Sequence, residues 1–284
     1  MPLPVKFFGP RDIKWHVKRY LESIDHQLKD KVAVDLPAGE GYTSKILYQL
    51  GAKVRAYDLF PESFGFRDLP CEFADLSDSL PLDTGSVDFL ICQEGIEHLP
   101  DQFFAFKEFN RVLKDQGRLI ITTPNYSNLR SKLSYLLSES ERYVSYMPPN
   151  EVDSIWASDI GDTASGSKKL RFYWGHIFLI GIQKLRMLAN ISGFRIKKIH
   201  PVKITNSSLV LFFIFYPLIL SVSFLSYLKI FFKTKNDSLA RKVYTEQIKL
   251  NLHPTVLLGS HLFIEFEKLE SLEKSLERIN LQNL

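Results

Sequence analysis

Two glycines and an aspartate near the start of the chain have the types and spacing of a ligand-binding turn. Gly39 and Gly41 follow the apolar run 31–36 and precede a stretch with helical spacing at 43–50. Glycines at such a turn let a ligand approach the backbone closely, and the start of a helix presents N–H groups that lack partners. Asp58 follows the next apolar run, where a carboxylate can accept hydrogen bonds from both hydroxyls of a ribose. The spacing therefore predicts a site for a ligand that contains a nucleoside.

A second group of titratable residues, Glu94, Glu97 and His98, comes directly after the apolar run 87–92. A histidine there could take a proton from a substrate hydroxyl, since the pKa of imidazole lies near neutrality. Alternatively, His98 caps or packs its loop and Glu97 orients it. Polar residues of two later loops are further candidates for lining an acceptor, with ordinary loop packing as the alternative: Asn125, Tyr126 and His176.

These residues need a framework that brings several strand ends to one edge of a sheet. Apolar runs alternate with stretches of helical spacing, which implies right-handed βαβ units and a doubly wound, parallel α/β sheet. The runs are nearly all apolar, as expected for strands with both faces covered, and ligands of such sheets bind beyond the carboxyl ends of the strands. The expected strands are 31–36, 53–57, 71–74, 87–92, 118–122, 194–204 and 261–266, and the expected helices are 11–28, 43–50, 102–113, 178–191 and one in the tail.

The middle of the chain has a less regular pattern. Residues 126–175 show weak periodicity after the fifth expected strand, so we expect an irregular substrate or lid region there. Residues 205–258 contain an apolar stretch followed by a more polar helix. We therefore expect one main domain, made of residues 1–204 and 259–284, and an apolar helical insertion at 205–258.

Composition narrows the classes of function. The chain has 284 residues and a formal net charge of +4, whereas a nucleic-acid binder needs a concentrated basic face, so we expect no nucleic-acid partner. The two cysteines, Cys71 and Cys92, do not form a CxxC pair, and we expect buried, inert thiols. Residues 1–10 lack the pattern of a secretory signal, which favours a cytoplasmic location.

One segment, 209–228, contains no charged residue and has the length of roughly 20 residues that a helix needs to cross a bilayer. Basic residues such as Lys229 and Lys233 follow it and would be attracted to anionic lipid. The segment could span a membrane, lie at the membrane face as a kinked helix or as a hairpin bent near Pro217 that enters one leaflet, or be buried in the domain. A single crossing would separate the closing strand 261–266 from its sheet. The sequence therefore favours peripheral attachment, at the inner face of the cell membrane.

The motifs VAVDLPAGEG, AYD, FADL, VDFLICQEGIEHLPD and GRLIITTPN, in this order over roughly residues 30–125, resemble those of the class I S-adenosylmethionine-dependent methyltransferases. The later stretch from His176 to Gly193-Phe194 is similar to a helix-then-Gly-Phe element of bacterial members. The resemblance implies a mostly parallel, seven-stranded, Rossmann-like sheet, and the apolar segment of this chain is then expected to be a hydrophobic helical insertion before the last strand. The resemblance also implies methyl transfer from S-adenosylmethionine, a cofactor that carries the difficult chemistry itself.

The resemblance implies that the turn at 37–41 holds the methionine part of the cofactor. Gly39 and Gly41 would lie against this part, and Asp35 would stand near its amino group. The family usually has glycine where this chain has Pro37. Because proline fixes φ and removes a backbone donor, this turn must accommodate both changes.

By the same resemblance, the other strand ends hold the nucleoside. Asp58 would bind the ribose, and Gln93 would sit near the sulfonium. Asp75 and Leu76 would flank the adenine. The complete cofactor set implied in this way is Asp35, Pro37, Ala38, Gly39, Gly41, Asp58, Asp75, Leu76 and Gln93.

The Glu-x-x-Glu-His spacing also resembles that of quinone-biosynthesis O-methyltransferases, in which such residues hold a divalent metal. Glu94, Glu97 and His98 would then be metal ligands. His98 is also the candidate catalytic base, and a packing role for the same residues stays open.

Three functions remain open at this level. The first is O-methylation of a hydrophobic or lipid-linked small molecule or glycan, with the methylated atom and the oligomeric state undetermined. The second is a methyltransferase-like scaffold that binds the cofactor poorly and associates with membranes. The third is a nicotinamide oxidoreductase, whose fingerprint needs a third glycine where this chain has Ser44.

Overall fold

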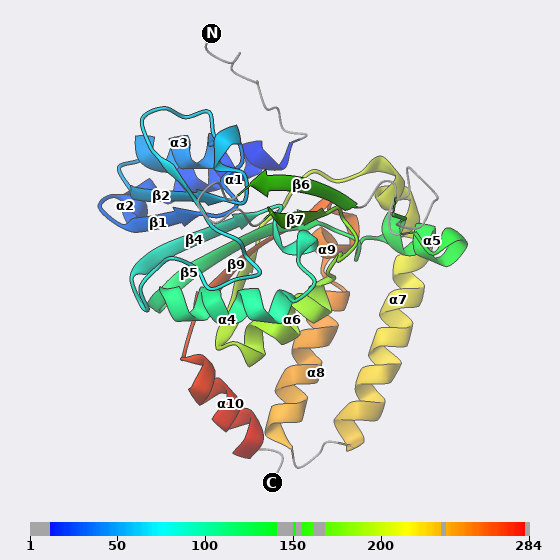
Figure 1. Cartoon of the computed structure of the whole chain (residues 1–284). Coiled ribbons are helices and arrows are strands. Elements are labelled where there is room, and N and C mark those ends of the chain that lie inside the picture. Colours follow the sequence, from blue (N-terminus) through cyan, green and yellow to red (C-terminus); the bar gives the residue numbers. More distant parts are fainter. Residues whose placement is uncertain (1–11, 141–149, 152–154, 162–167, 234–236, 282–284) are drawn as a thin grey trace.

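The computed structural model describes residues 12–140, 150–151, 155–161, 168–233 and 237–281. Seven strands form one sheet in the order β3-β2-β1-β4-β5-β9-β8 (Figure 1). The β1·β2, β1·β4, β2·β3 and β4·β5 pairs are parallel, and β9 is antiparallel to both of its neighbours. The expected mostly parallel, seven-stranded sheet is therefore confirmed. Its strands are β1 (Val32–Asp35), β2 (Lys53–Asp58), β3 (Cys71–Phe73), β4 (Val87–Gln93), β5 (Leu113–Pro124), β8 (Phe194–Ile199) and β9 (His261–Lys268).

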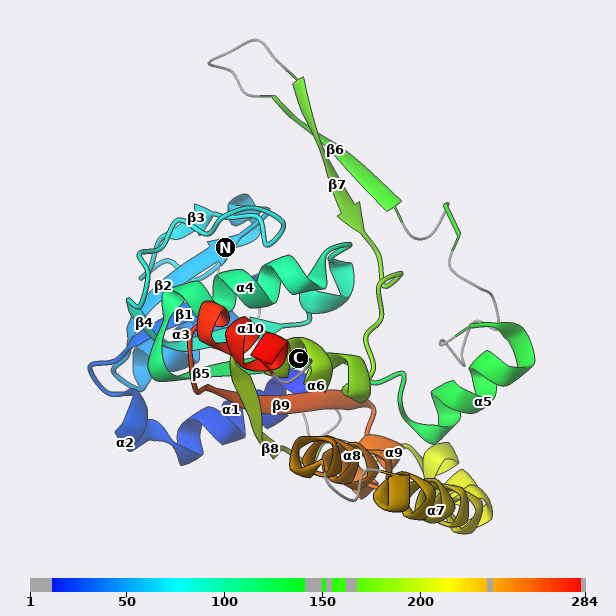
Figure 2. The same ribbon diagram turned by 90° about the horizontal axis from the view of Figure 1, so that it is seen from below.

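Helices cover both faces of the sheet (Figure 2). Along β4, Phe89 and Ile91 pack into one apolar core, whereas Leu90 and Cys92 pack into the other. Both faces of this strand are thus buried, which explains why its sequence is a nearly continuous apolar run. One face carries α1 (Ile13–Ser23), α2 (Asp25–Leu28) and α3 (Tyr42–Gln49), and the other carries α4 (Gln102–Val112) and α6 (Ile182–Ile191), on which α10 (Leu272–Leu281) packs.

Aspartate side chains cap the first turns of two of these helices. Asp12 accepts a hydrogen bond of 2.8 Å from the Lys14 amide at α1, and Asp101 accepts one of 2.9 Å from the Phe104 amide at α4. The expected single helix at 11–28 is wrong, because the chain breaks at Ile24 into α1 and α2. Burial continues through this break, so the apolar spacing does not reveal it.

The two cysteines differ in exposure. Cys92 is fully buried in β4, as expected, whereas Cys71 at the start of β3 is only half-buried. Burial, with a contribution from the nearby carboxylate of Asp58, raises the pKa of the Cys71 thiol to about 12. Both thiols are therefore protonated at neutral pH, which agrees with the expected inert character.

The segment 126–175 contains regular structure where an irregular region was expected. It includes α5 (Leu129–Ser138) and two strands, β6 (Ile155–Gly161) and β7 (Lys168–Trp174), which pair antiparallel as a separate two-stranded sheet. The residues at 141–149, 152–154 and 162–167 lie outside the described part of the chain. Pairing between two isolated strands needs no buried face, so apolar spacing gave no signal for it. A role for this segment in substrate binding stays a prediction.

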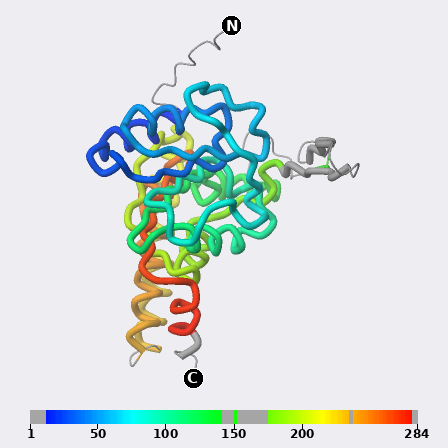
Figure 3. Tube along the Cα trace, turned by 60° about the vertical axis from the view of Figure 1, so that its left-hand side comes forward, coloured from blue at the N-terminus to red at the C-terminus, as the bar shows by residue number. Residues whose placement is uncertain are grey.

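Three helices form the insertion between β8 and β9: α7 (Asn206–Lys233), α8 (Ser238–Asn251) and α9 (Pro254–Leu258). α7 continues unbroken through Pro217, so the expected hairpin bent at this residue is wrong. A proline removes one helical hydrogen bond, a loss that a long helix can tolerate when its other backbone pairs persist. The direction reverses instead after α7, and α8 runs back antiparallel to it. Both helices extend away from the sheet on the same side as α10 (Figures 1 and 3).

Candidate active site

A cavity of about 340 Å³ opens at the carboxyl ends of β1, β2 and β4. Its volume falls within the range of small-molecule sites, roughly 300–1,000 Å³. Parallel strands end at the same edge of a sheet, so residues that are distant in sequence meet there. Ten of the predicted site residues line this cavity: Asp35, Pro37, Ala38, Gly39, Asp58, Asp75, Leu76, Gln93, Glu94 and His98.

Two predicted residues, Gly41 and Glu97, are not part of the cavity wall. Gly41 is the N-cap of α3 with a left-handed backbone, φ +83°, and a Cβ there would lie 2.7 Å from the Phe64 ring. Both its dihedral angle and its contact therefore require glycine. Gly41 thus fixes the conformation of the turn without lining the cavity. Gly39, with φ +52°, faces open space, in which a Cβ would meet nothing within 4 Å.

The proline that departs from the family pattern fits because of a second glycine. The Leu36–Pro37 peptide is cis, and the Pro37 ring packs where residue 95 would carry a side chain. A Cβ built on Gly95 would lie 2.6 Å from Pro37 Cδ. Pro37 has no backbone N–H to donate. The next backbone hydrogen bond of the turn is kept, because Ala38 N donates to Tyr57 O at 2.9 Å.

Asp58 ties the glycine turn to the end of β2. Its Oδ2 accepts a hydrogen bond of 2.7 Å from Gly39 N, and its Oδ1 accepts one of 2.8 Å from Phe60 N. Each carboxylate oxygen has a second lone pair, so both oxygens can also accept bonds from two ligand hydroxyls. The side chain is thus held rigidly at the cavity wall in an orientation suited to a ribose.

Asp35 is a buried carboxyl group with one oxygen left over. Its Oδ2 accepts a hydrogen bond of 2.6 Å from Ser44 Oγ, whereas its Oδ1 has no hydrogen-bond partner among the described residues. Burial raises the pKa of Asp35 to about 7. An orphaned acceptor in a cavity suits a cationic ligand group such as an ammonium. Because the Ser44 hydroxyl is already engaged with Asp35, Ser44 supports this carboxyl group.

The far wall of the cavity carries polar side chains that are also fixed by neighbours. Gln93 Oε1 accepts a hydrogen bond of 3.0 Å from Thr43 Oγ1, and Asp75 Oδ1 accepts one of 2.8 Å from Ser77 N. Leu76 is buried beside Asp75. This pairing of an acceptor with an apolar side chain suits the edge and the face of a purine ring.

Behind the cavity, a buried carboxylate meets two imidazoles. Glu97 is fully buried, and its Oε2 accepts a hydrogen bond of 3.0 Å from Thr123 Oγ1, while its Oε1 lies 4.0 Å from His176 Nε2. One ligand atom each of Glu97, His98 and His176 lie within 4.8 Å of one another. The two imidazole rings are 5.0 Å apart. Burial, with the charge of Glu94, raises the pKa of Glu97 to about 8.

Glu94 does not belong to this cluster, although the sequence grouped it there. Its Oε1 accepts a hydrogen bond of 2.9 Å from Thr122 Oγ1, and its Oε2 lies 3.5 Å from His261 Nε2. The backbone of Glu94 is left-handed, φ +52°, which directs the chain into the short turn Ile96–His98. Of the predicted metal ligands, the structure therefore brings Glu97 and His98 together, and His176 takes the third place.

Gln102 holds the loop that carries His176 against Glu97 and His98. Its Nε2 donates to Ile96 O at 3.0 Å and to Phe178 O at 2.6 Å, and Phe178 N donates to Glu97 O at 3.3 Å. These bonds clamp the loop that carries His176 onto the turn Ile96–His98. No signal in the sequence indicated this role of Gln102, because its partners are backbone carbonyls.

The remaining candidates for the acceptor side have packing roles. Asn125 is buried and donates to Val256 O at 2.8 Å and to Gly259 O at 2.9 Å, which anchors the end of β5 to α9. The Tyr126 ring packs beside Gly181. Sequence reasoning missed several residues that do line the cavity, since they lie in helix starts or after strands without a distinctive pattern: Lys14, Tyr42, Thr43, Phe60 and Leu99.

Comparisons with known proteins agree with this geometry. A family model described as a methyltransferase domain matches residues 34–121. The ubiquinone biosynthesis O-methyltransferase of Xanthomonas oryzae pv. oryzae (strain PXO99A) is 32% identical over 101 residues, which are 32% of this chain and 42% of that protein. The protein of the same name from Psychrobacter arcticus is 28% identical over 185 residues, 55% of this chain and 71% of that protein. The chain thus spans less than half the length of the first of these relatives.

Solved structures support the fold. An S-adenosylmethionine-dependent methyltransferase from Archaeoglobus fulgidus superposes with a TM-score of 0.51 at 15% identity, covering 90% of this chain and 94% of that one. A putative one from Listeria monocytogenes gives 0.50 at 12% identity, with 90% and 97% covered. The matched family model and the strand order agree: residues 34–121 belong to a methyltransferase domain, in a chain with the fold of the class I S-adenosylmethionine-dependent methyltransferases.

Proposed function

We propose that the chain is an S-adenosylmethionine-dependent O-methyltransferase that acts on a hydrophobic or lipid-linked acceptor. The observation that carries this proposal is the convergence of Asp35, Gly39, Asp58 and Gln93 on one cavity at the carboxyl edge of the sheet. These residues come from three different strands and the turn between two of them. A purely structural role would not require an orphaned carboxyl oxygen at the same place.

The residues present fit the cofactor. Asp35 Oδ1 would accept from the ammonium of the methionine part, the Gly39 turn would approach its backbone, and Asp58 would hold the ribose. Asp75 would accept from the adenine amine, with Leu76 against the ring. When bound, S-adenosylmethionine supplies an activated methyl group. The protein aligns the acceptor with this methyl group at near-attack distance.

We propose that His98 takes the proton of the acceptor hydroxyl. It lies on the cavity wall, and the buried Glu97 and the second imidazole of His176 lie behind it. The donor set of these three residues also fits a divalent cation, which is the second role that the geometry favours. Such an ion would bind the acceptor oxygen and lower its pKa.

Two observations support the proposed nature of the acceptor. The relatives named above are ubiquinone biosynthesis O-methyltransferases, so their names point to a hydrophobic product. This chain has an exposed apolar helix, α7, next to the edge of the sheet at which the cavity opens. Both favour an acceptor with a lipid-like part. The location that we propose is the cytoplasm, with contact to the inner face of the membrane.

Isothermal calorimetry tests the proposal. We expect S-adenosylmethionine and S-adenosylhomocysteine to bind and NAD not to bind. Asp58→Ala should weaken cofactor binding at least about tenfold, because it removes an acceptor for charged or hydroxyl donors, each worth roughly 1.5–3 kcal/mol. Asp68→Ala, at an exposed carboxylate outside the cavity, is the matched control. Binding of NAD alone, or of no nucleotide, would contradict the proposal, and a product heavier by one methyl group would support it directly.

A further inference from the structure

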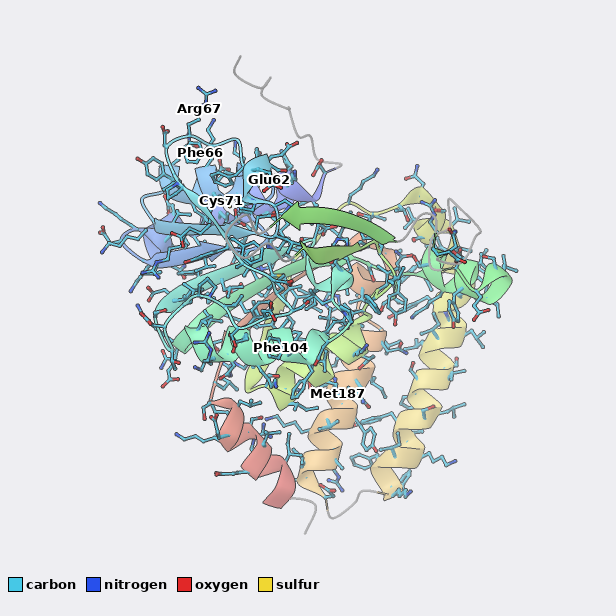
Figure 4. All side chains as sticks on the ribbon, viewed as in Figure 1. Glu62, Phe66, Arg67, Cys71, Phe104 and Met187 are labelled. Carbon is cyan, nitrogen blue, oxygen red and sulfur yellow. The ribbon has the colours of Figure 1, made fainter. Side chains whose placement is uncertain are left out.

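The long helix α7 exposes an apolar face that nothing in the described chain covers. Within the described residues, Asn206–Lys233 is the one helix long and apolar enough to cross a membrane, and only 11% of its most apolar window is buried. A buried position for this segment is therefore excluded. Side chains project from α7 on the side away from α8 (Figure 4). We use the name outer face for the six most exposed apolar side chains of α7, which are Val210, Phe213, Ile214, Leu218, Leu225 and Phe232.

The helix α8 occupies the opposite side of α7 and determines how α7 can meet a membrane. Ser223 Oγ accepts a hydrogen bond of 2.8 Å from Asn251 Nδ2, and farther along, the Arg241 guanidinium lies 4.6 Å from the Phe231 ring. Because α8 carries Arg241, Lys242, Glu246 and Lys249, a span by α7 would draw these charges into hydrocarbon at several kcal/mol in total. With α8 in place, α7 can present its outer face only along the plane of a surface.

The helix α5 extends the apolar face beyond the start of α7. The two helices contact each other, and both views show α5 beside the first turns of α7 (Figures 1 and 2). Tyr135, Leu136 and Leu137 at its end are exposed, and Leu136 is 79% exposed. An exposed face that spans two helices exceeds the scattered apolar residues of ordinary protein surfaces.

The charges around this face indicate its partner. α7 contains no acidic residue and has Lys229 and Lys233 near its end. On α8, Arg241, Lys242 and Lys249 stand against a single acidic residue, Glu246, which pairs with Arg186 at 3.2 Å. The two lysines of α7 complement anionic lipid headgroups, and the net positive charge of α8, one helix behind, acts in the same sense. In a symmetric dimer that packs α7 on α7, the facing helix would contain no acidic residue to pair with the two lysines.

We infer that the outer face of α7 and the end of α5 dock on an anionic lipid bilayer, with α7 lying in the plane of the surface. The inference rests on the membrane contact proposed above and deepens it, because it names the surface that makes the contact and its orientation. It also places the cavity near the lipid. α7 begins just after the bridge between Ile204 and Gly259, and β9 then starts at His261, which pairs with Pro124 and lies 3.5 Å from the cavity residue Glu94. The edge of the sheet that holds the site is thus the edge from which α5 and α7 emerge.

Flotation of the purified full chain with vesicles tests the inference, using phosphatidylcholine alone or mixed with phosphatidylglycerol. We expect the wild-type chain to float with the anionic vesicles. Phe213→Ser/Phe232→Ser should reduce the bound fraction at least about tenfold, since burying one such side chain contributes roughly 1.5–3 kcal/mol. Tyr48→Ser/Leu269→Ser, at exposed apolar positions on other elements, is the matched control and should float like wild type. Circular dichroism of each variant checks that it is folded.

The contribution of the basic residues and the depth of α7 in the bilayer are measured in separate experiments. Lys229→Gln/Lys233→Gln should lower binding to anionic vesicles roughly thirtyfold, at about 1 kcal/mol per basic residue, and leave binding to phosphatidylcholine unchanged. A fluorophore at residue 213, 218 or 232, in a Cys71→Ser background, should be quenched by shallow lipid labels to the same degree at all three positions.

Three results would overturn the inference. The first is that the wild-type chain stays in the aqueous fraction. The second is that the fluorophore at 218 lies much deeper in the bilayer than the fluorophores at 213 and 232. The third is that the wild-type chain binds no vesicles and forms a lipid-free dimer, which Phe213→Ser/Phe232→Ser dissociates. None of these measurements needs cofactor or turnover, so their failure is separate from a failure of the proposed reaction.

Discussion

A single carboxyl group, Asp35, links the protonation of this protein to its cofactor. Burial raises its pKa to about 7, so the free protein holds it mostly neutral below that pH and mostly ionised above it. An ammonium group prefers the ionised form. Affinity for S-adenosylmethionine should therefore rise about tenfold between pH 5.5 and pH 7, as the ionised fraction grows. Calorimetry across this range measures the effect.

Asp35→Asn is the variant that isolates this effect. It keeps the shape of the side chain and the contact to Ser44, yet it cannot ionise, so cofactor affinity should be lower and independent of pH over the same range. A variant with the pH dependence of the wild-type protein would assign the titration to another group.

His98 is the second residue whose role can be measured. If it takes the acceptor proton, His98→Ala should lower kcat by roughly 10²-fold and leave the dissociation constant of S-adenosylhomocysteine unchanged. His26→Ala, at an exposed position outside the cavity, is the control. A chelator separates the two proposed roles. If the rate falls with chelator and His176→Ala raises the Mg²⁺ or Mn²⁺ concentration needed for half-maximal rate, the cluster holds a metal. An unchanged rate in His98→Ala would remove His98 from the mechanism.

Residue types predicted the cofactor side of the site better than its acceptor side. Asp35, Asp58 and Gln93 each follow an apolar strand, and a parallel sheet brings such positions to one edge whatever their loops do. The grouping of Glu94 with Glu97 failed for a local reason. A left-handed residue followed by a tight turn sends neighbouring side chains in different directions, and sequence spacing does not record this. His176 was found as a candidate, but its approach to Glu97 depends on the clamp by Gln102.

At the scale of elements, the turn after β1 depends on a pair of residues far apart in sequence. Pro37 fits because position 95 lacks a side chain, and a Cβ there would lie 2.6 Å from the proline ring. Gly95→Ala should lower the free energy of unfolding by about 1–3 kcal/mol, the usual cost of overpacking. Replacing the proline as well, in Pro37→Gly/Gly95→Ala, should restore part of the loss. Thermal unfolding of the single and double variants measures the coupling. Additive effects of the two substitutions would show that the contact is not the cause.

Apolar patterning predicted the elements that lie in the sheet and its covering helices. Strands such as β4 are buried on both faces, so their runs stand out. The same logic could not detect the pair β6·β7, which forms apart from the main sheet. Nor could it show that α7 passes straight through Pro217, because the effect of one proline depends on whether the rest of the helix is supported, here by α8 and α9.

At the scale of the whole molecule, the reaction and the membrane contact make a joint prediction. The cavity opens at the edge of the sheet from which α5 and α7 emerge, so docking of the outer face would bring the site to acceptors that stay in the bilayer. With such an acceptor in anionic vesicles, Phe213→Ser/Phe232→Ser should lower the methylation rate about tenfold at limiting lipid, following the loss of binding. A water-soluble acceptor with the same reactive group should be methylated at the wild-type rate by this variant, because the substitutions lie outside the cavity.

Transfer of labelled methyl groups to both acceptors, measured side by side with Tyr48→Ser/Leu269→Ser, tests whether the acceptor reaches the cavity from the bilayer. Equal losses with both acceptors would mean that the outer face supports the fold of the site, and equal rates would mean that the acceptor reaches the cavity from water.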